Sequence, residues 1–344
     1  MMRFIKKLLG VTADPERVTP GSLPIEGKMP EFVGITGWLN SPPLAKADLS
    51  DRVVLVNFWT LSCINSLRPL PYLKTWHERY TTHGLTIIGI HSPEFAFENR
   101  RENVDVAVQR FDLTYPVALD PEHATWNAYR NHYWPAYYFI DRAGNIRHHF
   151  FGEGSYEYSE QVIRALLQED GTNLSDQPKT DYIYESAKQS TKTPEMYLGY
   201  ARLEYLGSPE SIAINASREY SVVKHPALNI FYLAGEWEIK KDYAVARSDD
   251  ARLVLQYQGT EVNIILEAEN EQSDASFVEI KLDGKSLNKK NSGADVKMAA
   301  GRSMIRVIGG RLYQAVSTPD RTGTHLLELD FPRPGIRCYT LTFG

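Results

Sequence analysis

The run Val-Val-Leu-Val-Asn-Phe-Trp-Thr-Leu-Ser-Cys-Ile-Asn-Ser, residues 53–66, decides the fold of the first half of this 344-residue chain. Its apolar, β-branched part, Val53–Trp59, is typical of a strand that is buried on both faces. A short loop then delivers Cys63 to the start of a predicted helix. Backbone N–H groups at a helix N-terminus favour the thiolate and lower the pKa of a thiol placed there. We therefore predict that Cys63 is a reactive cysteine.

Ser66 stands one helical turn after Cys63, where a dithiol enzyme has its second cysteine. The only other cysteine of the chain, Cys338, lies in a predicted C-terminal strand, and we interpret it as a small residue of a sheet surface. The spacing predicts a site with one thiol, to which the Ser66 hydroxyl donates a hydrogen bond. Whether Ser66 is native or replaces a cysteine stays open.

Strand and helix signals alternate along the rest of the first half. The pattern predicts a helix over Asn65–Thr82 with a kink at Pro71, and a second buried strand at Leu85–His91. The Trp134-Pro135 bond precedes a strand and is predicted to be cis. Further helices are expected at Glu98–Phe111, Ala124–Asn131 and Tyr158–Gln168, and further strands at Tyr115–Leu119, Tyr137–Asp141 and Ile146–Phe151. Such alternation predicts right-handed βαβ units on a central sheet.

The pattern changes in the second half. Residues 169–193 are polar and rich in turn formers, which indicates a linker, and a short helix is expected over Pro194–Leu206. Beyond it, about eight short strands separated by turns are typical of an all-β sandwich, specifically a jelly roll. We predict an N-terminal extension (1–25), an α/β domain (26–168), the linker (169–193) and an all-β domain (194–344).

The charge, motifs and apolar runs of the sequence argue against several classes of function. The formal net charge of −5 gives no reason to expect nucleic acid as a partner. Neither metal-ligand spacing nor a glycine-rich phosphate loop occurs, so we expect no metal and no other cofactor. The basic N-terminus lacks the uninterrupted apolar run of a secretory signal, and no apolar run reaches the roughly 18 residues of a membrane span.

Several motifs carry a family resemblance. Phe58-Trp59-Thr60 before Cys63, Trp134-Pro135-Ala136 and Ile140–Gly144 together resemble a thioredoxin-like redoxin of the TlpA/ResA type. The chain is most similar to the C-terminal region of DipZ-type proteins, through His91–Phe95, Asn131–Ala136, Phe151–Gly154, Thr193–Tyr200, Arg311–Gln314 and Thr342–Gly344. This resemblance spans nearly the whole chain. It implies a thioredoxin-like fold followed by a carbohydrate-binding-module-like jelly roll.

The resemblance also implies a thiol–disulfide oxidoreductase that acts on protein disulfides. Cys63 is then the nucleophile, Ser66 stands at the resolving position, and Pro135 packs beside the thiol and shapes a groove for an extended client. Supporting or client-binding residues are expected at Trp59, Thr60, Asn65, Glu94 and Trp134. Because one thiol cannot release its own mixed disulfide, the expected partners are client proteins and an external thiol or reductase.

Two alternative functions stay open. Thr60 lies three residues before Cys63, as in peroxiredoxins, although Val56 stands where those enzymes have proline; this leaves a monothiol peroxidase as one alternative. The other is a glycan- or protein-binding module with a degenerate redoxin scaffold. For that module, the aromatic residues Trp237, Tyr243, Tyr257 and Tyr313 are either a sugar-stacking surface or core.

The location of the chain also stays open. DipZ-type proteins are extracytoplasmic and carry a membrane electron-transfer domain before the redoxin. This sequence shows neither that domain nor a convincing export signal. The resemblance therefore favours a periplasmic location, with the cytoplasm as the alternative, and the source of electrons is undecided.

Overall fold

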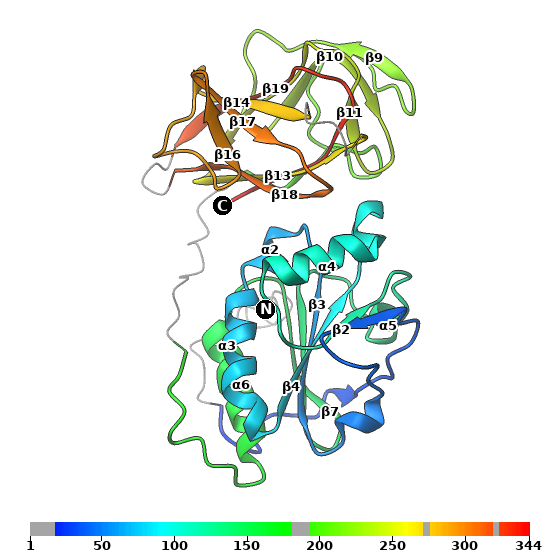
Figure 1. The fold of residues 1–344 in the computed structure, drawn as a ribbon, viewed down its shortest axis with the longest axis vertical. Coiled ribbons are helices and arrows are strands. Elements are labelled where there is room, and N and C mark those ends of the chain that lie inside the picture. The colour runs from blue at the N-terminus through cyan, green and yellow to red at the C-terminus, as the bar shows by residue number, and fades with distance from the viewer. Residues whose placement is uncertain (1–17, 181–192, 271–275, 319–322) are drawn as a thin grey trace, which may run out of the picture. The chain divides into compact units, whose positions relative to one another are not determined.

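The computed structural model describes residues 18–180, 193–270, 276–318 and 323–344, and the chain divides into two compact units, residues 1–186 and 187–344 (Figure 1). Most of the predicted N-terminal extension and residues 181–192 of the predicted linker lie outside the described residues. The first unit is an α/β structure and the second is built from strands, as predicted.

One mixed sheet forms the centre of the first unit. Within the described residues it contains seven strands: β1 (Gly27–Lys28), β2 (Gly37–Leu39), β3 (Val53–Trp59), β4 (Leu85–His91), β5 (Val117–Leu119), β6 (Ala136–Ile140) and β7 (Asn145–Phe151). Their order is β1-β7-β6-β3-β4-β5-β2, with β3, β4 and β5 parallel and β6 antiparallel to β3. Every residue of β3 is buried, as its apolar run predicts. The thioredoxin-like fold is confirmed.

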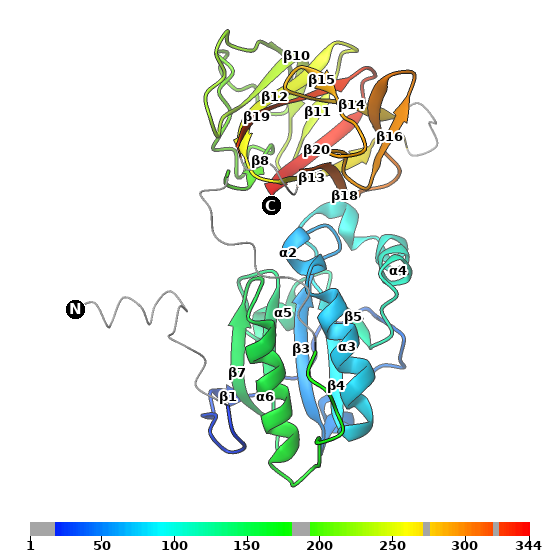
Figure 2. The ribbon, with the colours of Figure 1, turned by 90° about the vertical axis from the view of Figure 1, so that its left-hand side faces the viewer.

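Helices cover both faces of this sheet. They are α2 (Ile64–Leu67), α3 (Leu70–Tyr80), α4 (Arg101–Arg110), α5 (Ala124–Ala128) and α6 (Tyr156–Gln168), with short 3-10 helices η1 (Lys46–Leu49), η2 (Thr81–His83) and η3 (Ala96–Asn99). Figure 2 shows α3 and α6 side by side in front of the sheet, and the Tyr80 hydroxyl donates to Glu160 at 2.6 Å. On the other face, the Trp126 ring packs edge-on against Phe58 of β3 at 5.7 Å.

The helix predicted over Asn65–Thr82 is interrupted, because it contains a second proline. α2 ends at Leu67, Pro69 is the N-cap of α3, and α3 begins at Leu70. Pro71 lies in the first turn of α3, where its missing N–H has no helical acceptor in any case. The kink predicted at Pro71 is therefore wrong: the interruption lies at Pro69, and α2 is a single turn.

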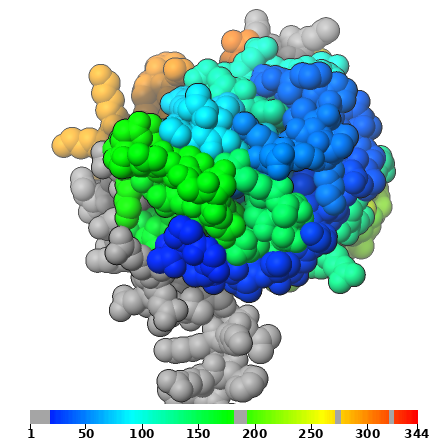
Figure 3. All heavy atoms as spheres, turned by 90° about the horizontal axis from the view of Figure 1, so that it is seen from below, coloured from blue at the N-terminus to red at the C-terminus, as the bar shows by residue number. Residues whose placement is uncertain are grey.

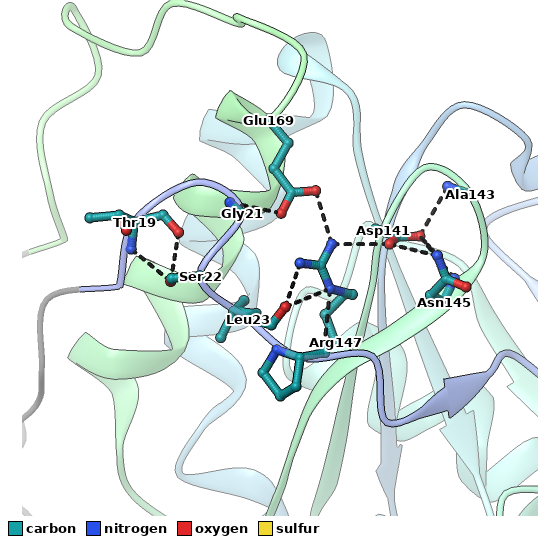
Figure 4. Close-up of polar contacts among 10 residues, drawn as sticks. Thr19, Gly21, Ser22, Leu23, Asp141, Ala143, Asn145, Arg147 and Glu169 are labelled. Atoms are coloured by element: carbon teal, nitrogen blue, oxygen red, sulfur yellow. Dashed lines mark hydrogen bonds and ion pairs between the residues drawn. The ribbon is translucent and has the colours of Figure 1, made fainter.

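A buried cluster around Arg147 fastens the N-terminal segment to the end of the sheet where β6 passes into β7 (Figure 4). The Arg147 guanidinium contacts Asp141 at 3.1 Å and Glu169 at 3.0 Å. It also donates to the carbonyl oxygen of Leu23 at 2.6 Å, and the amide of Gly21 donates to Glu169 at 3.1 Å. In Figure 3 the N-terminal segment, drawn in blue, lies against the green part of the chain that contains these partners.

The second unit is all-β, which confirms the predicted class. Its described strands are β8 (Met196–Tyr197), β9 (Ser217–Tyr220), β10 (Phe231–Ile239), β11 (Ala244–Ala246), β12 (Ala251–Gln258), β13 (Glu261–Ala268), β14 (Phe277–Leu282), β15 (Lys285–Ser286), β16 (Val296–Ala299), β17 (Arg302–Arg306), β18 (Arg311–Ser317), β19 (Thr324–Phe331) and β20 (Ile336–Phe343). These strands pair antiparallel and enclose one apolar core.

β10 links the two sets of strands around that core. Its first half pairs with β12, up to Ala234 opposite Arg252, and its second half pairs with β9 and β11. The change occurs at Gly235, whose φ is +75° and whose added Cβ would lie 2.9 Å from the Cα of Ala251. Glycine is required there because the backbone turns between sheets with another strand close by.

The short helix predicted over Pro194–Leu206 does not form. Met196 and Tyr197 instead pair with β20, opposite Leu341 and Thr340, and the amide of Leu198 continues the pairing. Met196 and Leu198 enter the core of the second unit. Tertiary pairing with β20 thus overrides the local helical preference.

Candidate active site

The strand ends of the first unit bring three loops to one edge of the sheet. Trp59 at the end of β3 lies opposite His91 at the end of β4, and Phe58 lies opposite Ala136 at the start of β6. The loops that contain Cys63, residues 92–95 and Pro135 therefore begin or end at this edge, which we call the reactive edge.

Cys63 lies at the position that the sequence predicts, at the start of a helix. It is the N-cap residue of α2, with φ −81° and ψ 116°, and it is partly exposed. The amides of Ser66 and Leu67 donate to its carbonyl oxygen at 2.9 and 3.1 Å. Arg68 and Pro69 keep helical dihedral angles after α2, so the chain leaves Cys63 in a helical course despite the interruption.

The Ser66 side chain does not make the predicted hydrogen bond to Cys63. Ser66 is 1% exposed, and its Oγ has no hydrogen-bond partner among the described residues. Cys63 still has the extended backbone of an N-cap, so its side chain does not follow the one-turn spacing that the prediction assumed. Asn65, between them, is partly exposed.

The Trp134-Pro135 bond is cis, as predicted. The Trp134 indole N–H donates to the carbonyl oxygen of Ser92 at 2.8 Å, and its ring lies 4.3 Å from that of Trp126. The carbonyl of Pro135 accepts from Gly152 at 2.8 Å. The Trp134 backbone has no hydrogen-bond partner within the described part of the chain, so it presents a donor and an acceptor at the reactive edge.

Two further contacts lie beside Cys63. Burial raises the pKa of Tyr137, two residues after Pro135, and the nearby Tyr156, Tyr115, Glu153 and Cys63 raise it further. Arg68, the C-cap residue of α2, forms an ion pair with Glu153 at 3.1 Å.

Trp59 and Thr60 are fully buried behind the loop that contains Cys63. The Trp59 ring lies edge-on to His91 at 5.2 Å. His91 is 2% exposed, burial lowers its pKa to about 3, and its Nε2 has no partner among the described residues. His91 lines a cavity of about 90 Å³ together with Glu98 and Asp120.

Glu98 is a site residue that sequence reasoning missed. It is fully buried, and both of its carboxylate oxygens accept hydrogen bonds, from Ser62 and from the amides of Glu94 and Phe95. Burial raises the pKa of Glu98, with the hydrogen bonds from Ser62 acting in the opposite direction. The signal was its spacing, because a glutamate three residues after Phe95 fits the capping box of a helix start. The sequence pattern instead places Glu98 at the start of a helix over Glu98–Phe111. In the structure Glu98 belongs to η3, and α4 begins at Arg101.

Of the four aromatic residues that the sequence offers for a sugar-stacking surface, three lie in the core of the second unit. Trp237, Tyr257 and Tyr313 are fully buried members of its core, and Tyr243 alone of the four is partly exposed. The interpretation of these residues as core is confirmed for the three. Cys338 is also fully buried, and burial raises the pKa of its thiol, which makes it unsuitable as a resolving thiol.

The described residues contain no group of three His, Cys, Asp or Glu side chains arranged to hold a metal ion. In the same part of the chain, no helix combines the length and the apolar character that crossing a membrane requires.

Comparison with known proteins assigns both halves of the chain. Residues 26–149 match the AhpC/TSA family, and residues 193–344 match the family described as the thioredoxin like C-terminal domain. Protein DipZ of Mycobacterium bovis is 33% identical over 92% of this chain and 43% of its own length. The chain thus spans less than half the length of the DipZ relatives that it matches.

Smaller relatives match the first unit. The thiol-disulfide oxidoreductase YkuV of Bacillus subtilis is 27% identical over 41% of this chain and 95% of its own length. The thiol-disulfide oxidoreductase ResA of Geobacillus thermodenitrificans is 26% identical over 35% of this chain and 66% of its own length.

Proposed function

Because the chain is a homologue of DipZ, YkuV and ResA, with a thioredoxin-like AhpC/TSA domain followed by a thioredoxin like C-terminal domain, we propose that it is a thiol–disulfide oxidoreductase that works through Cys63. One observation carries this proposal. Cys63 begins a helix at the reactive edge, and the position of a second thiol is occupied by the buried Ser66.

The exchange begins with the Cys63 thiolate. It attacks one sulfur of a client disulfide, forms a mixed disulfide with that sulfur, and expels the other client sulfur as a thiolate. Ser66 supplies no thiol to reverse this bond. An external thiolate then attacks the Cys63 sulfur and releases the client reduced. A second external thiol regenerates Cys63, so two thiols are oxidised to one disulfide for each client disulfide reduced.

The client is an extended protein segment. The unpaired backbone N–H and C=O of Trp134 lie next to Pro135 and offer strand-like hydrogen bonds to such a segment. Asn65 and Glu94 are partly exposed and stand close to this edge in sequence, so we propose them as client contacts. Pro135 shapes the floor of the groove, and Trp59 and Thr60 support it.

Trapping tests this proposal. The chain is mixed with an unfolded client that carries an activated disulfide, and the products are separated without reducing agent and identified by mass spectrometry. We expect a mixed disulfide at Cys63 that persists until an external thiol is added. If no adduct forms at Cys63, the proposal is wrong, and glycan or protein binding without exchange then becomes the better account.

The match to the AhpC/TSA family keeps the peroxidase as the second candidate. In that reaction a peroxide oxygen is transferred to the Cys63 thiolate, which gives a sulfenic acid and an alcohol or water. Dimedone, which labels sulfenic acids, separates the two functions. Rapid labelling of Cys63 after equimolar peroxide, together with failure to exchange with disulfides, would favour the peroxidase.

A further inference from the structure

We propose that Glu98 is a positioning residue that fixes the Cys63 loop relative to the Trp134-Pro135 loop. The inference rests on the proposed function, because it concerns how the same site aligns its nucleophile with its client. It begins at the two carboxylate oxygens of Glu98, which join two separate segments of the reactive edge.

The first segment is the Cys63 loop. Oε1 of Glu98 accepts from the amide of Ser62 at 3.1 Å and from its hydroxyl at 2.5 Å. Ser62 immediately precedes Cys63 and, like Glu98, is fully buried. Two hydrogen bonds from one residue to the same oxygen hold that residue in place, so this contact defines where the loop presents Cys63.

The second segment is residues 92–95. Oε2 of Glu98 accepts from the amides of Glu94 at 2.6 Å and Phe95 at 2.9 Å. The carbonyl of Ser92, in the same segment, accepts the indole N–H of Trp134 at 2.8 Å. A continuous series of contacts therefore runs from Cys63 through Glu98 to the residue before Pro135.

Other contacts hold residues 92–95 in place. The Ser92 hydroxyl donates to Asp120 at 3.1 Å, and a ring nitrogen of His123 lies 2.8 Å from the carbonyl of Pro93. Asp120 also accepts from the amides at the start of α5. These contacts fix residues 92–95 to the rest of the first unit. Because Glu98 bonds to both this segment and Ser62, it holds the Cys63 loop at a defined position relative to the unit.

Only a carboxylate fits this arrangement. Four donors converge on its two oxygens, two on each. Glutamine has the same shape but one acceptor oxygen, and its NH₂ group would face N–H donors. Misplacement of reacting atoms by about 1 Å can cost about 100-fold in rate. Glu98→Gln is therefore expected to impair alignment strongly.

Two probes separate alignment from reactivity. The small probe is 5,5′-dithiobis(2-nitrobenzoate), and the large probe is an unstructured cysteine peptide that carries 2-nitro-5-thiobenzoate as its mixed disulfide. Both release the same coloured thiolate when Cys63 attacks, but only the peptide needs the Trp134-Pro135 loop. The ratio of the two second-order rate constants, peptide over small probe, therefore reports alignment when it is measured on chains that circular dichroism shows to be folded.

In the full chain, Glu98→Gln is expected to lower this ratio about 100-fold. Ser62→Ala, which deletes the hydroxyl donor to Glu98, is expected to lower it about 10-fold. Trp134→Phe, which removes the indole donor at the other end of the series, is expected to lower it too. Since all act on one series of contacts, combining Ser62→Ala with Trp134→Phe should give less than the product of their effects. The matched control is Glu102→Gln, an exposed glutamate of α4, which should keep the wild-type ratio.

If Glu98→Gln does not fold, Ser62→Ala and Trp134→Phe decide the question alone. The proposal is overturned if Ser62→Ala, and Glu98→Gln where it folds, keep the wild-type ratio or lower both rate constants equally. A wild-type chain that reacts with the small probe but not with the peptide contradicts the proposed client exchange instead. A wild-type chain inert to both probes contradicts the reactivity of Cys63 itself.

Discussion

The two ends of the first unit's sheet bury polar side chains in different ways. Where β6 passes into β7, Arg147 is surrounded by acceptors, among them Asp141 and Glu169. At the reactive edge, Ser66 Oγ and His91 Nε2 are buried and have no hydrogen-bond partner among the described residues. Buried polar groups in folded proteins are nearly always paired, so unpaired ones need an explanation. One end thus uses buried polar groups to hold the chain, whereas the reactive edge leaves two of them without a protein partner, which accords with the proposed function.

Glu98 lies at the reactive edge, but its hydrogen bonding resembles that of the Arg147 cluster at the opposite end of the sheet. It is buried and accepts hydrogen bonds at both oxygens, as Asp141 does around Arg147. The reactive edge therefore contains two hydrogen-bonded carboxyl groups, Glu98 and Asp120, beside the unpaired Ser66 and His91 side chains.

The largest expected effect is the loss of Cys63. Cys63→Ala removes the only exposed thiol of the chain and should abolish adduct formation with disulfide probes, with little change in the free energy of unfolding. Mass spectrometry of the trapped products checks this. The matched control is Cys338→Ala, which should keep the exchange rate because Cys338 is fully buried. Exchange that survives in Cys63→Ala would remove the chemistry from the reactive edge.

At the opposite end, Arg147→Met should destabilise the first unit by about 3–5 kcal/mol, since it leaves the buried Asp141 carboxylate without its cation. Urea unfolding followed by tryptophan fluorescence measures this. Arg101→Met is the control, because its ion pair with Asp105, at 3.7 Å, is exposed and should contribute at most about 1 kcal/mol. Below the unfolding transition, Arg147→Met should exchange like the wild type. A selective loss of exchange would break the distinction between the two ends.

Ser66→Cys tests whether the reactive edge lacks only its second thiol. An internal thiol one turn from Cys63 should speed client release about 100-fold over millimolar external thiol, because the attack becomes intramolecular. The rate of insulin reduction checks this. Ser66→Ala is the control: its hydroxyl has no partner, so its removal should change neither exchange nor stability appreciably. If Ser66→Ala loses exchange, the Ser66 hydroxyl takes part in the reaction, although it makes no hydrogen bond in this structure.

The sequence alone was sufficient to predict those elements in which the local apolar pattern matches the burial in the fold. β3 and β4 begin and end at the predicted residues, since apolar runs flanked by polar loops leave little freedom. The position of Cys63 at a helix start and the cis bond before Pro135 were predicted from neighbouring residues alone. Most strands of the second unit were also found, with ends displaced by a few residues.

The features that the sequence did not predict depend on contacts between segments that are distant in the chain. The helix expected over Pro194–Leu206 yields to pairing with β20, more than 130 residues away, which no local pattern reports. Glu98 acquires its importance only when Ser62, 36 residues earlier, is folded against it. The pairing state of the Ser66 hydroxyl likewise depends on how the N-cap orients Cys63, which sequence spacing does not specify.

The smallest expected effect lies on β7, which runs between the two ends. His149 contacts Glu26 at 2.6 Å, and this hydrogen bond raises the pKa of His149 in the folded state. A raised pKa means that the pair stabilises the fold below the usual histidine pKa of about 6.5, and that this stability is lost as the pH rises through the raised value. Because the His149 side chain is 44% exposed, the contribution should be only about 0.5 kcal/mol.

Glu26→Gln should return the pKa of His149 toward its ordinary value, which an NMR titration of the imidazole resonances measures. The same variant should lose stability at about pH 6 and match the wild type at about pH 8, where the imidazole is neutral in both. An equal loss at both pH values would show that Glu26 acts through packing or backbone contacts. A loss of stability as large as that of Arg147→Met would mean that the exposed His149–Glu26 pair stabilises the N-terminal segment as strongly as the Arg147 cluster does. Burial would then not explain the strength of the Arg147 cluster.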